Sequence, residues 1–309
     1  MVRMTEPTPA KAERRPPQRQ LAGPLMALPA LLALLLFVAL PFLTALTLSF
    51  TNLRMGSPLP TEFVAVQQYQ RAFDDHSFRR ALVNNVVFAA VVVPLQTLLA
   101  LGLALALNRR FCGRTVFRTL FFLPVVFPMA LIAVVWQLIY APGPNGVLNA
   151  LLATVSFGAI EPVDFLRHPQ LALPALMLLS IWQGVGFQMV VLLAGLQSIP
   201  TSLYEAAAVD RAGKWSQFVH VTLPQLRNPL VFTALVTTIL SFRVYDQVAI
   251  ATRGGPLDAT TTVMFETVRT VFDRQQVGLA SAMTVVFFLM VLAVTLVQRA
   301  LVRQEREID

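Results

Sequence analysis

The sequence predicts an all-α integral membrane protein, and three features of the chain lead to that fold class. Hydrophobic residues make up 56% of the 309 residues and charged residues only 13%. The mean hydropathy is +0.66. An ordinary soluble domain is about 25% charged, so this chain has too little polar surface to cover a globule in water. The third feature is a set of apolar stretches of about 20 residues or more, which is the length that a helix needs to cross a bilayer.

Six stretches are long and apolar enough to be membrane-spanning helices, because a helix satisfies its own backbone hydrogen bonds in lipid. The fifth stretch differs from the others because it carries Arg243 and Asp246 near its end. The expected spans are 24–50, 82–107, 120–140, 171–197, 229–250 and 277–301.

The N-terminal segment 1–20 is basic and rich in Pro, Arg and Gln, and it has little to bury, so we expect it to be disordered. The apolar stretch after it is too long for a signal-peptide core, and no small-residue cleavage site follows, so we expect an uncleaved first span. Residues 21–303 are then expected to form one transmembrane domain, followed by a short tail at 304–309.

The distribution of Lys and Arg among the loops predicts which side of the membrane each loop occupies. With the N-terminus placed in the cytoplasm, fifteen basic residues lie on the cytoplasmic side and eight on the outer side. Positive charge is retained in the cytoplasm during insertion. Both termini are therefore expected to be cytoplasmic.

The connection between the fourth and fifth spans is long for a simple link, so we expect it to contain helices. Ser202 and Glu205 have the spacing of a capping box, in which each side chain bonds a backbone amide of the other residue. The first helix would run to Gly213, which can end it in a left-handed conformation. Trp215 and the apolar residues after it predict a second short helix. Segment 199–224 is thus expected to be a cytoplasmic helix-turn-helix whose exposed alanines and aromatic residues suit a protein partner.

One run of residues in this segment follows a known pattern. It consists of Glu205, Ala206, Ala207, Asp210, Ala212, Phe218, Val221, Thr222, Leu223, Pro224 and Pro229. The run resembles the EAA motif of permease subunits of bacterial ABC importers, in particular the carbohydrate group that includes the maltose and glycerol-3-phosphate permeases. Further similarity at 194–200, 254–256 and 278–282 extends the resemblance over most of the chain. One position departs: the family usually has Gly where this chain has Arg211, so either Gly213 takes over the turn or the turn differs.

The resemblance implies a type I ABC importer permease with six transmembrane helices in the bacterial inner membrane. The implied partners are a second, related permease subunit, two ATPase subunits, an extracytoplasmic solute-binding protein and the lipid bilayer, with no nucleic acid. ATP and Mg would belong to the ATPase, because this chain has no G-x-x-x-x-G-K-[ST] phosphate loop. We therefore expect a non-enzymatic transport subunit that binds no cofactor itself. One cysteine and three widely separated histidines also argue against a metal site.

The resemblance further implies that the EAA segment sits in a cleft of the ATPase and transmits its motion. The candidate coupling residues are Ser202, Glu205, Ala206, Ala207, Asp210, Gly213, Leu223 and Pro224. Two interpretations of Glu205 stay open, namely contact with a basic group of the ATPase and the carboxylate of the capping box.

Charged residues within a span are candidates for a solute pathway, because they are costly in lipid unless they face a cavity or a partner. Arg243 and Asp246 stand three residues apart and would share one helix face, so they could line a cavity or form a structural pair. Since both lie near the end of the span, Arg243 could instead extend to the headgroups.

Uncharged polar residues are a second group of candidates for the pathway. Aromatic faces stack on sugar rings and amides bond hydroxyl groups, so Trp182, Gln183, Gln188 and Tyr245 suit sugar binding. The alternative is that they are interface aromatics and interhelical hydrogen bonds, which are common in membrane proteins.

The expected function is import of a sugar or oligosaccharide delivered by the binding protein. Glycerol-3-phosphate or a glycerophosphodiester is the alternative, because the guanidinium of Arg243 suits phosphate. An ion-coupled secondary carrier is less favoured, since Asp246 is the only acidic residue within a span. An intramembrane enzyme is also less favoured, because no histidine lies in a span.

Overall fold

The computed structural model describes residues 18–109 and 111–304, and side chains for residues 26–109 and 111–300. Most of the expected N-terminal tail and the last five residues lie outside the described residues. Gln18–Gln20 were expected in that tail but are helical, and the last helix runs to Gln304, one residue beyond the expected domain. The chain divides into two compact units, one ending at Thr47 and the other beginning at Leu48.

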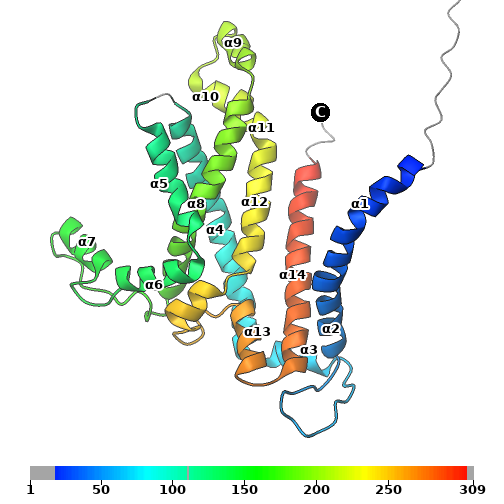
Figure 1. Ribbon diagram of the computed structural model, residues 1–309. Coiled ribbons are helices and arrows are strands. Elements are labelled where there is room, and N and C mark those ends of the chain that lie inside the picture. Colours follow the sequence, from blue (N-terminus) through cyan, green and yellow to red (C-terminus); the bar gives the residue numbers. More distant parts are fainter. Residues whose placement is uncertain (1–17, 110, 305–309) are drawn as a thin grey trace, which may run out of the picture. The chain divides into compact units, whose positions relative to one another are not determined.

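The described chain is helical, with one isolated antiparallel bridge between Thr51 and Phe63 (Figure 1). The first unit contains α1 (Gln18–Leu34), the π-helix η1 (Leu35–Ala39) and all but the last residue of α2 (Leu40–Leu48). The second unit contains α3 (Gln67–Asp74), α4 (His76–Asn108), α5 (Arg114–Val126), α6 (Met129–Ile139), α7 (Val147–Val155), α8 (Ala172–Ser198), α9 (Thr201–Val209), α10 (Lys214–Gln217), η2 (Phe218–Thr222), α11 (Leu223–Gln225), α12 (Arg227–Phe242), η3 (Val248–Thr252), α13 (Val263–Phe272) and α14 (Val277–Gln304).

The expected all-helical membrane fold is confirmed, but the six uniform spans are not. Four helical segments of the described chain are long and apolar enough to cross a membrane: Met26–Leu48, His76–Asn108, Ala172–Ser198 and Val277–Ala300. The third expected span is a bent pair, α5 and α6, and the fifth is an apolar helix of 16 residues, α12. The two corrections have separate physical causes.

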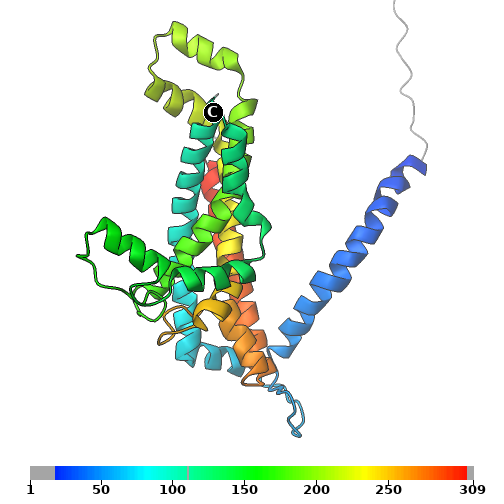
Figure 2. The ribbon, with the colours of Figure 1, turned by 60° about the vertical axis from the view of Figure 1, so that its left-hand side comes forward.

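The third expected span is bent by 104° between α5 and α6. A proline disfavours helical geometry in the residue before it, and Phe127, before Pro128, is extended with φ −82° and ψ 141°. The chain therefore leaves the direction of α5 at this point, and Figure 2 shows α6 lying across the long helices.

The fifth expected span ends as an α-helix at Phe242 instead of continuing to residue 250. Two buried polar side chains bind carbonyl groups at this break. Asn85 donates to the carbonyl of Phe242 over 3.1 Å, and Thr262 donates to that of Val244 over 2.8 Å. Non-helical backbone is tolerated at membrane depth where protein groups bind it in this way.

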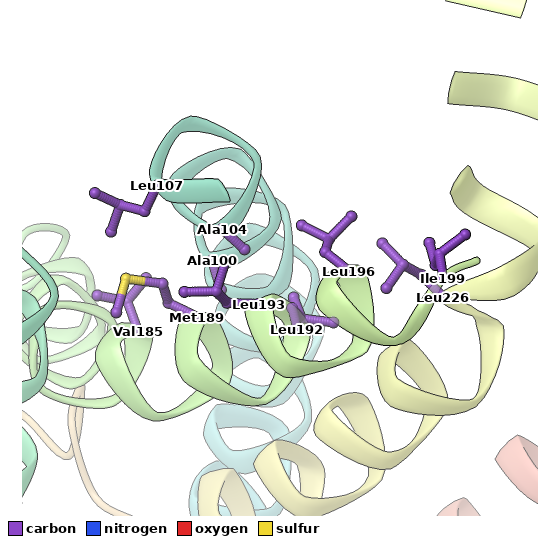
Figure 3. Close-up of a cluster of buried hydrophobic side chains, with 10 residues drawn as sticks. All are labelled: Ala100, Ala104, Leu107, Val185, Met189, Leu192, Leu193, Leu196, Ile199 and Leu226. Atoms are coloured by element: carbon purple, nitrogen blue, oxygen red, sulfur yellow. The ribbon is translucent and has the colours of Figure 1, made fainter. Parts of the chain in front are cut away.

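Within the second unit, α8 is the central helix and packs on α4, α5 and α12 (Figures 1 and 2). Figure 3 shows the cluster at one end of these contacts, in which Ala100 and Ala104 of α4 meet Met189 and Leu192 of α8. Small residues let helices approach closely. The resulting van der Waals contacts drive helix association inside a membrane, where the hydrophobic effect does not. At Gly186, for example, an added Cβ would overlap the carbonyl oxygen of Phe121.

Candidate functional site

Helices α9 and α10 project beyond the end of α8 that lies opposite α13 (Figure 1). Helix α9 begins at Thr201 and its N-cap is Pro200, with no hydrogen bond from a capping side chain. The expected capping box is therefore wrong: Ser202 lies inside the first turn, because the fixed φ of proline sets the start of the helix one residue earlier. Glu205 is left exposed, and within the described residues its carboxylate has no hydrogen bond or ion pair.

The turn after α9 also differs from the expectation at Gly213. Arg211 takes the left-handed conformation with φ 55°, whereas Gly213 is extended with φ −66° and ψ 164°. The amide of Ala212 donates to the carbonyl of Ala207 over 2.9 Å, which closes the C-terminus of α9 around Arg211. The residue that replaces the family glycine thus adopts the conformation for which glycine is usually selected.

One side-chain contact holds α9 to the segment that follows it, and a second holds the turn after α9 to α10. The hydroxyl groups of Tyr204 and Thr222 are 2.9 Å apart, and Gln217 donates to the carbonyl of Ala212 over 3.1 Å. The ring of Tyr204 also packs on the buried cluster at the end of α8. Sequence analysis missed the contact between Tyr204 and Thr222, although Tyr204 stands next to Glu205 on a predicted helix. These contacts make α9–α11 (201–225) a structured unit.

The candidate coupling residues are almost all accessible. Ala207 is half-buried, and the others are exposed: Ser202, Glu205, Ala206, Asp210, Gly213, Leu223 and Pro224. Beside them, Val209 is 83% and Trp215 76% exposed, which leaves apolar surface next to the acidic groups. A protein surface of mixed character is what a docking helix offers.

A cavity of about 480 Å³ lies within the second unit. Its wall is formed by residues of α4, α5, α6, α8 and α12 and of the break after α12. The lining residues are Gln96, Val125, Met129, Gln183, Gly184, Phe187, Val236, Thr237, Leu240, Arg243, Val244, Tyr245, Asp246 and Gln247. Small-molecule sites commonly have volumes of roughly 300–1,000 Å³, so the cavity can hold a small solute.

Four of the six pathway candidates line this cavity, and two of them are Arg243 and Asp246. Both are exposed, and within the described residues no ion pair joins them. Arg243 lies just after the end of α12, so the two residues do not share one regular helix face as the sequence suggested. Their charges face the cavity without neutralising each other directly.

The other two lining candidates are Gln183 of α8 and Tyr245, while Trp182 and Gln188 lie elsewhere. Trp182 packs edge-to-face on Trp136, with ring centroids 5.6 Å apart. Gln188 is wholly buried and its side-chain amide donates to the hydroxyl of Thr237. These two residues thus fit the alternative interpretation of interface aromatics and interhelical hydrogen bonds.

Three polar residues of the cavity were missed by sequence analysis: Gln96, Thr237 and Gln247. Gln96 lies against Gly184, where an added Cβ would approach its amide nitrogen to 2.6 Å. Gln247 donates to Ser180 over 3.1 Å. A buried amide within an apolar helix was the signal that could have identified Gln96.

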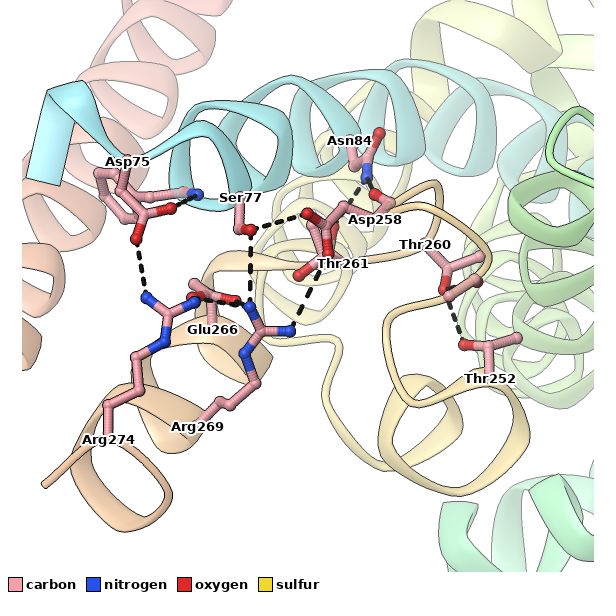
Figure 4. A network of polar contacts seen from close by, with 12 residues as sticks. Asp75, Ser77, Asn84, Thr252, Asp258, Thr260, Thr261, Glu266, Arg269 and Arg274 are labelled. Carbon is pink, nitrogen blue, oxygen red and sulfur yellow. Dashed lines mark hydrogen bonds and ion pairs between the residues drawn. The ribbon is translucent and has the colours of Figure 1, made fainter.

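A second polar cluster, the Glu266 network, joins α13, the preceding loop and the start of α4 (Figure 4). Glu266 is wholly buried and lies 3.1 Å from Arg269 and 2.9 Å from Arg274. Arg274 also contacts Asp75 over 2.7 Å, and Arg269 lies 3.9 Å from Asp258. The network therefore fixes the loop after η3 on the first turn of α4.

Burial and ion pairing act in opposite directions in this network. Burial raises the pKa of Glu266, and Arg274 and Arg269 offset only part of that effect. Burial is the largest single effect on Asp75 and would raise its pKa, but the hydrogen bond and charge of Arg274, together with the backbone amides of Ser77 and Phe78, outweigh burial and hold the pKa below the ordinary value. The spacing of Glu266 and Arg269, three residues apart, was the sequence signal for part of this cluster.

Comparison with known proteins gives a family match and full-length relatives. Residues 98–307 match the family model described as binding-protein-dependent transport system inner membrane component. The chain is 34% identical over 293 residues to the probable ABC transporter permease protein YurN of Bacillus subtilis, covering 94% of this chain and 99% of that protein.

A second relative and a solved structure extend the comparison. The trehalose/maltose transport system permease protein MalF of Thermococcus litoralis is 33% identical over 286 residues, 92% of this chain and 95% of that protein. The fold is similar to a chain in the crystal structure of a bacterial alginate ABC transporter in complex with an alginate pentasaccharide-bound periplasmic protein. There the TM-score is 0.79 at 20% identity, over 93% of this chain and 96% of that one.

Proposed function

The chain belongs to the family of binding-protein-dependent transport system inner membrane components, and from this premise we propose that it carries a sugar or oligosaccharide through its central cavity. As a member of this family it is a membrane-embedded permease subunit of an ABC importer. The observation that carries the choice of solute is the cavity of about 480 Å³ between α4, α8 and α12.

The lining of the cavity suits an uncharged, hydroxyl-rich solute. Amides of Gln96 and Gln183 and the hydroxyl of Tyr245 can bond sugar hydroxyl groups, and the ring of Phe187 offers an apolar face. Arg243 and Asp246 contribute one positive and one negative charge, so the lining has no net charge to attract an anion. The name of the relative MalF, a trehalose/maltose transport system permease protein, agrees with this choice.

We assign the coupling role to the exposed face of α9–α11. Glu205 is free to pair with a basic group of an ATPase, and Ala206 leaves room for close approach. The hydrogen bond between Tyr204 and Thr222 supports movement of this segment as one body, which would transmit ATPase closure to α8 and α12. ATP and Mg are then bound by the ATPase and not by this chain, which acts as a non-enzymatic subunit.

The proposed assembly contains a second permease, two ATPases and an extracytoplasmic binding protein. Residues 21–303 would form the permease domain, with the helix-turn-helix at 199–224 in the cytoplasm. Both termini would also be cytoplasmic, as the distribution of Lys and Arg predicts. A periplasmic solute-binding protein is part of the solved complex whose permease shares the fold.

Coupling is tested in the complete complex, reconstituted in proteoliposomes with its binding protein. Glu205→Ala should reduce solute-stimulated ATP hydrolysis about tenfold, which corresponds to roughly 1.4 kcal/mol, the scale of one charge-assisted hydrogen bond. Glu62→Ala is the matched control, because Glu62 is an exposed carboxylate in the loop before α3. Equal stimulation of ATP hydrolysis in the native protein, Glu205→Ala and Glu62→Ala would reject the coupling role of Glu205.

The solute is tested by uptake of a panel of sugars and glycerophosphodiesters. Arg243→Gln and Asp246→Asn should each raise the KM for the transported sugar, whereas Arg253→Gln, at an exposed site outside the cavity lining, should not. Glycerol-3-phosphate or a glycerophosphodiester remains the second candidate, because the guanidinium of Arg243 suits phosphate and has no ion pair within the described residues. Saturable uptake of phosphorylated solutes alone, abolished by Arg243→Gln, would replace the sugar by that candidate.

A further inference from the structure

Helices α6 and α7 lie across the direction of α4 and α8 in both views (Figures 1 and 2). They belong to a stretch, 119–160, that contains no charged residue. Helix α7 has nine residues, about 13 Å, and is too short to cross the roughly 30 Å core of a bilayer. Helix α7 therefore has a role other than spanning the membrane.

One face of α7 is fixed to the rest of the unit. Asn149 is 3% exposed, and its amide nitrogen donates to the carbonyls of Ala141 and Val163. Its side-chain oxygen accepts from the amide of Val163 over 3.0 Å. Leu148 packs with Tyr140 in the cluster between α6 and α8. Asn149 thus binds the backbone on both sides of α7, at Ala141 and at Val163.

The opposite face of α7 is apolar and uncovered. Val147, Leu151 and Val155 recur every fourth residue and are 62%, 58% and 70% exposed. Phe157, in the turn that follows, is 98% exposed. Helix α6, which contacts α7, has an exposed apolar face of its own, formed by Leu131, Val134, Val135 and Leu138, all about half exposed or more. Contiguous apolar surface of this kind marks contact with a membrane or a protein.

The position of α7 along α8 identifies the membrane as the contact. Helix α8 has 27 residues, about 40 Å, so each of its ends extends about 5 Å beyond the hydrocarbon core. The hydroxyl of Tyr140 donates to the carbonyl of Ala175 in the first turn of α8, which places the end of α6 at that boundary. Trp136 and Tyr140 are buried between α6 and α8, which holds α6 at this depth.

We infer that α7 lies in the headgroup region of the leaflet opposite α9, with Val147, Leu151, Val155 and Phe157 inserted among the acyl chains. Lipid is the occupant because the apolar face carries no charge for a partner subunit to pair with, and because the neighbouring helix α6 also exposes an apolar face. Met129 of α6 lines the central cavity, so this anchor would hold one wall of the cavity at a fixed depth. The inference needs the chain to lie in a membrane but does not depend on the solute.

The test uses the complete complex in lipid nanodiscs, with the exposed Cys112 replaced by serine. Single cysteines at positions 147, 151 and 155 carry a nitroxide, and collisions with oxygen and with a water-soluble nickel chelate are compared. Oxygen collisions should dominate at all three positions, because oxygen concentrates in the acyl region. Position 161, an exposed glutamate after α7, is the control at which nickel collisions should dominate.

Two results would overturn the inference. Nickel collisions that dominate at 147, 151 and 155 would place the face in water. Low collision rates with both reagents would mean that a protein covers it, and repeating the measurement without the binding protein would identify the second permease or the binding protein as that partner. Three separate label positions keep the test decisive if one variant fails to assemble. Transport is not measured, so failure here is distinct from failure of the proposed function.

Discussion

The wholly buried carboxylate of Glu266 lies 2.9 Å from the guanidinium of Arg274. The same guanidinium reaches Asp75, the N-cap of α4, over 2.7 Å. Arg274 therefore connects α13 to the start of α4 through two carboxylates. Residues of the break after α12 line the cavity, and the loop that follows them leads into α13. This connection therefore sets the position of one end of the cavity wall.

Loss of Arg274 should destabilise the protein strongly. Arg274→Met leaves Glu266 buried with Arg269 as its remaining cation, and removing one partner of a buried ion pair costs about 3–5 kcal/mol. The thermal unfolding midpoint of the purified complex measures the effect. Arg167→Met is the matched control, because Arg167 pairs with Asp164 on the surface and should change stability by less than about 1 kcal/mol.

The double variant Glu266→Gln with Arg274→Met should recover part of the lost stability, since it removes the buried charge that has lost one of its two cations. An Arg274→Met midpoint that matches the Arg167→Met midpoint would contradict the assignment of Arg274 as the central cation of the network.

Asp75 should make the stability of the protein depend on pH in the acid range. Its folded pKa lies below the ordinary value of 3.8, so its contribution is present above that value and is lost as the pH falls through the folded pKa. Asp75→Asn should therefore be less stable than the native protein at pH 7, and the difference should shrink below about pH 4. Glu266 contributes with the opposite sign, because its pKa is raised, but it is common to both proteins.

The control for this pH dependence is Asp74→Asn, because Asp74 is the exposed carboxylate directly before Asp75. Chemical denaturation of both variants across pH separates the two positions. A difference between Asp75→Asn and the native protein that stays constant with pH would show that the loss arises from packing and not from the charge.

The sequence predicted the membrane fold and the projecting helices because both depend on local patterns. Length and apolarity gave the long helices α4, α8 and α14, and helical spacing gave α9 and α10. The bend between α5 and α6 has a local cause, Pro128, which was visible in the sequence. The break after α12 could not be predicted, because it depends on contacts between distant residues. The end of α12 at Phe242 depends on Asn85, 157 residues away.

The candidate site was predictable to a similar degree. Arg243 and Asp246 stood out as charges within an apolar span, and both line the cavity. Gln96 and Thr237 did not stand out, because an amide or hydroxyl in a membrane helix is common and its direction is set by tertiary packing. The same limit applies to Trp182 and Gln188, whose residue types suit a sugar but whose side chains point elsewhere.

Gly186 should tolerate no side chain. An added Cβ would overlap the carbonyl oxygen of Phe121 and lie 2.9 Å from the Cα of Phe122, so α5 would have to move away from α8. Gly186→Ala should destabilise the protein by about 1–3 kcal/mol through overpacking. Gly102→Ala is the control, since open space surrounds Gly102 in α4 and alanine there should stabilise the helix by roughly 0.5–1 kcal/mol. Equal unfolding midpoints for the two variants would contradict the close approach of α5 and α8.

Arg211→Gly should stabilise the turn between α9 and α10, because Arg211 has φ 55° and a non-glycine residue pays about 1 kcal/mol in that conformation. Hydrogen exchange of the α9 amides measures local opening, and the variant should slow it several-fold. Gly213→Ala tests the other half of the correction: Gly213 is extended and surrounded by open space, so alanine should leave exchange unchanged or slightly slower. If Gly213→Ala accelerates exchange while Arg211→Gly has no effect, then Gly213 is the residue that ends α9.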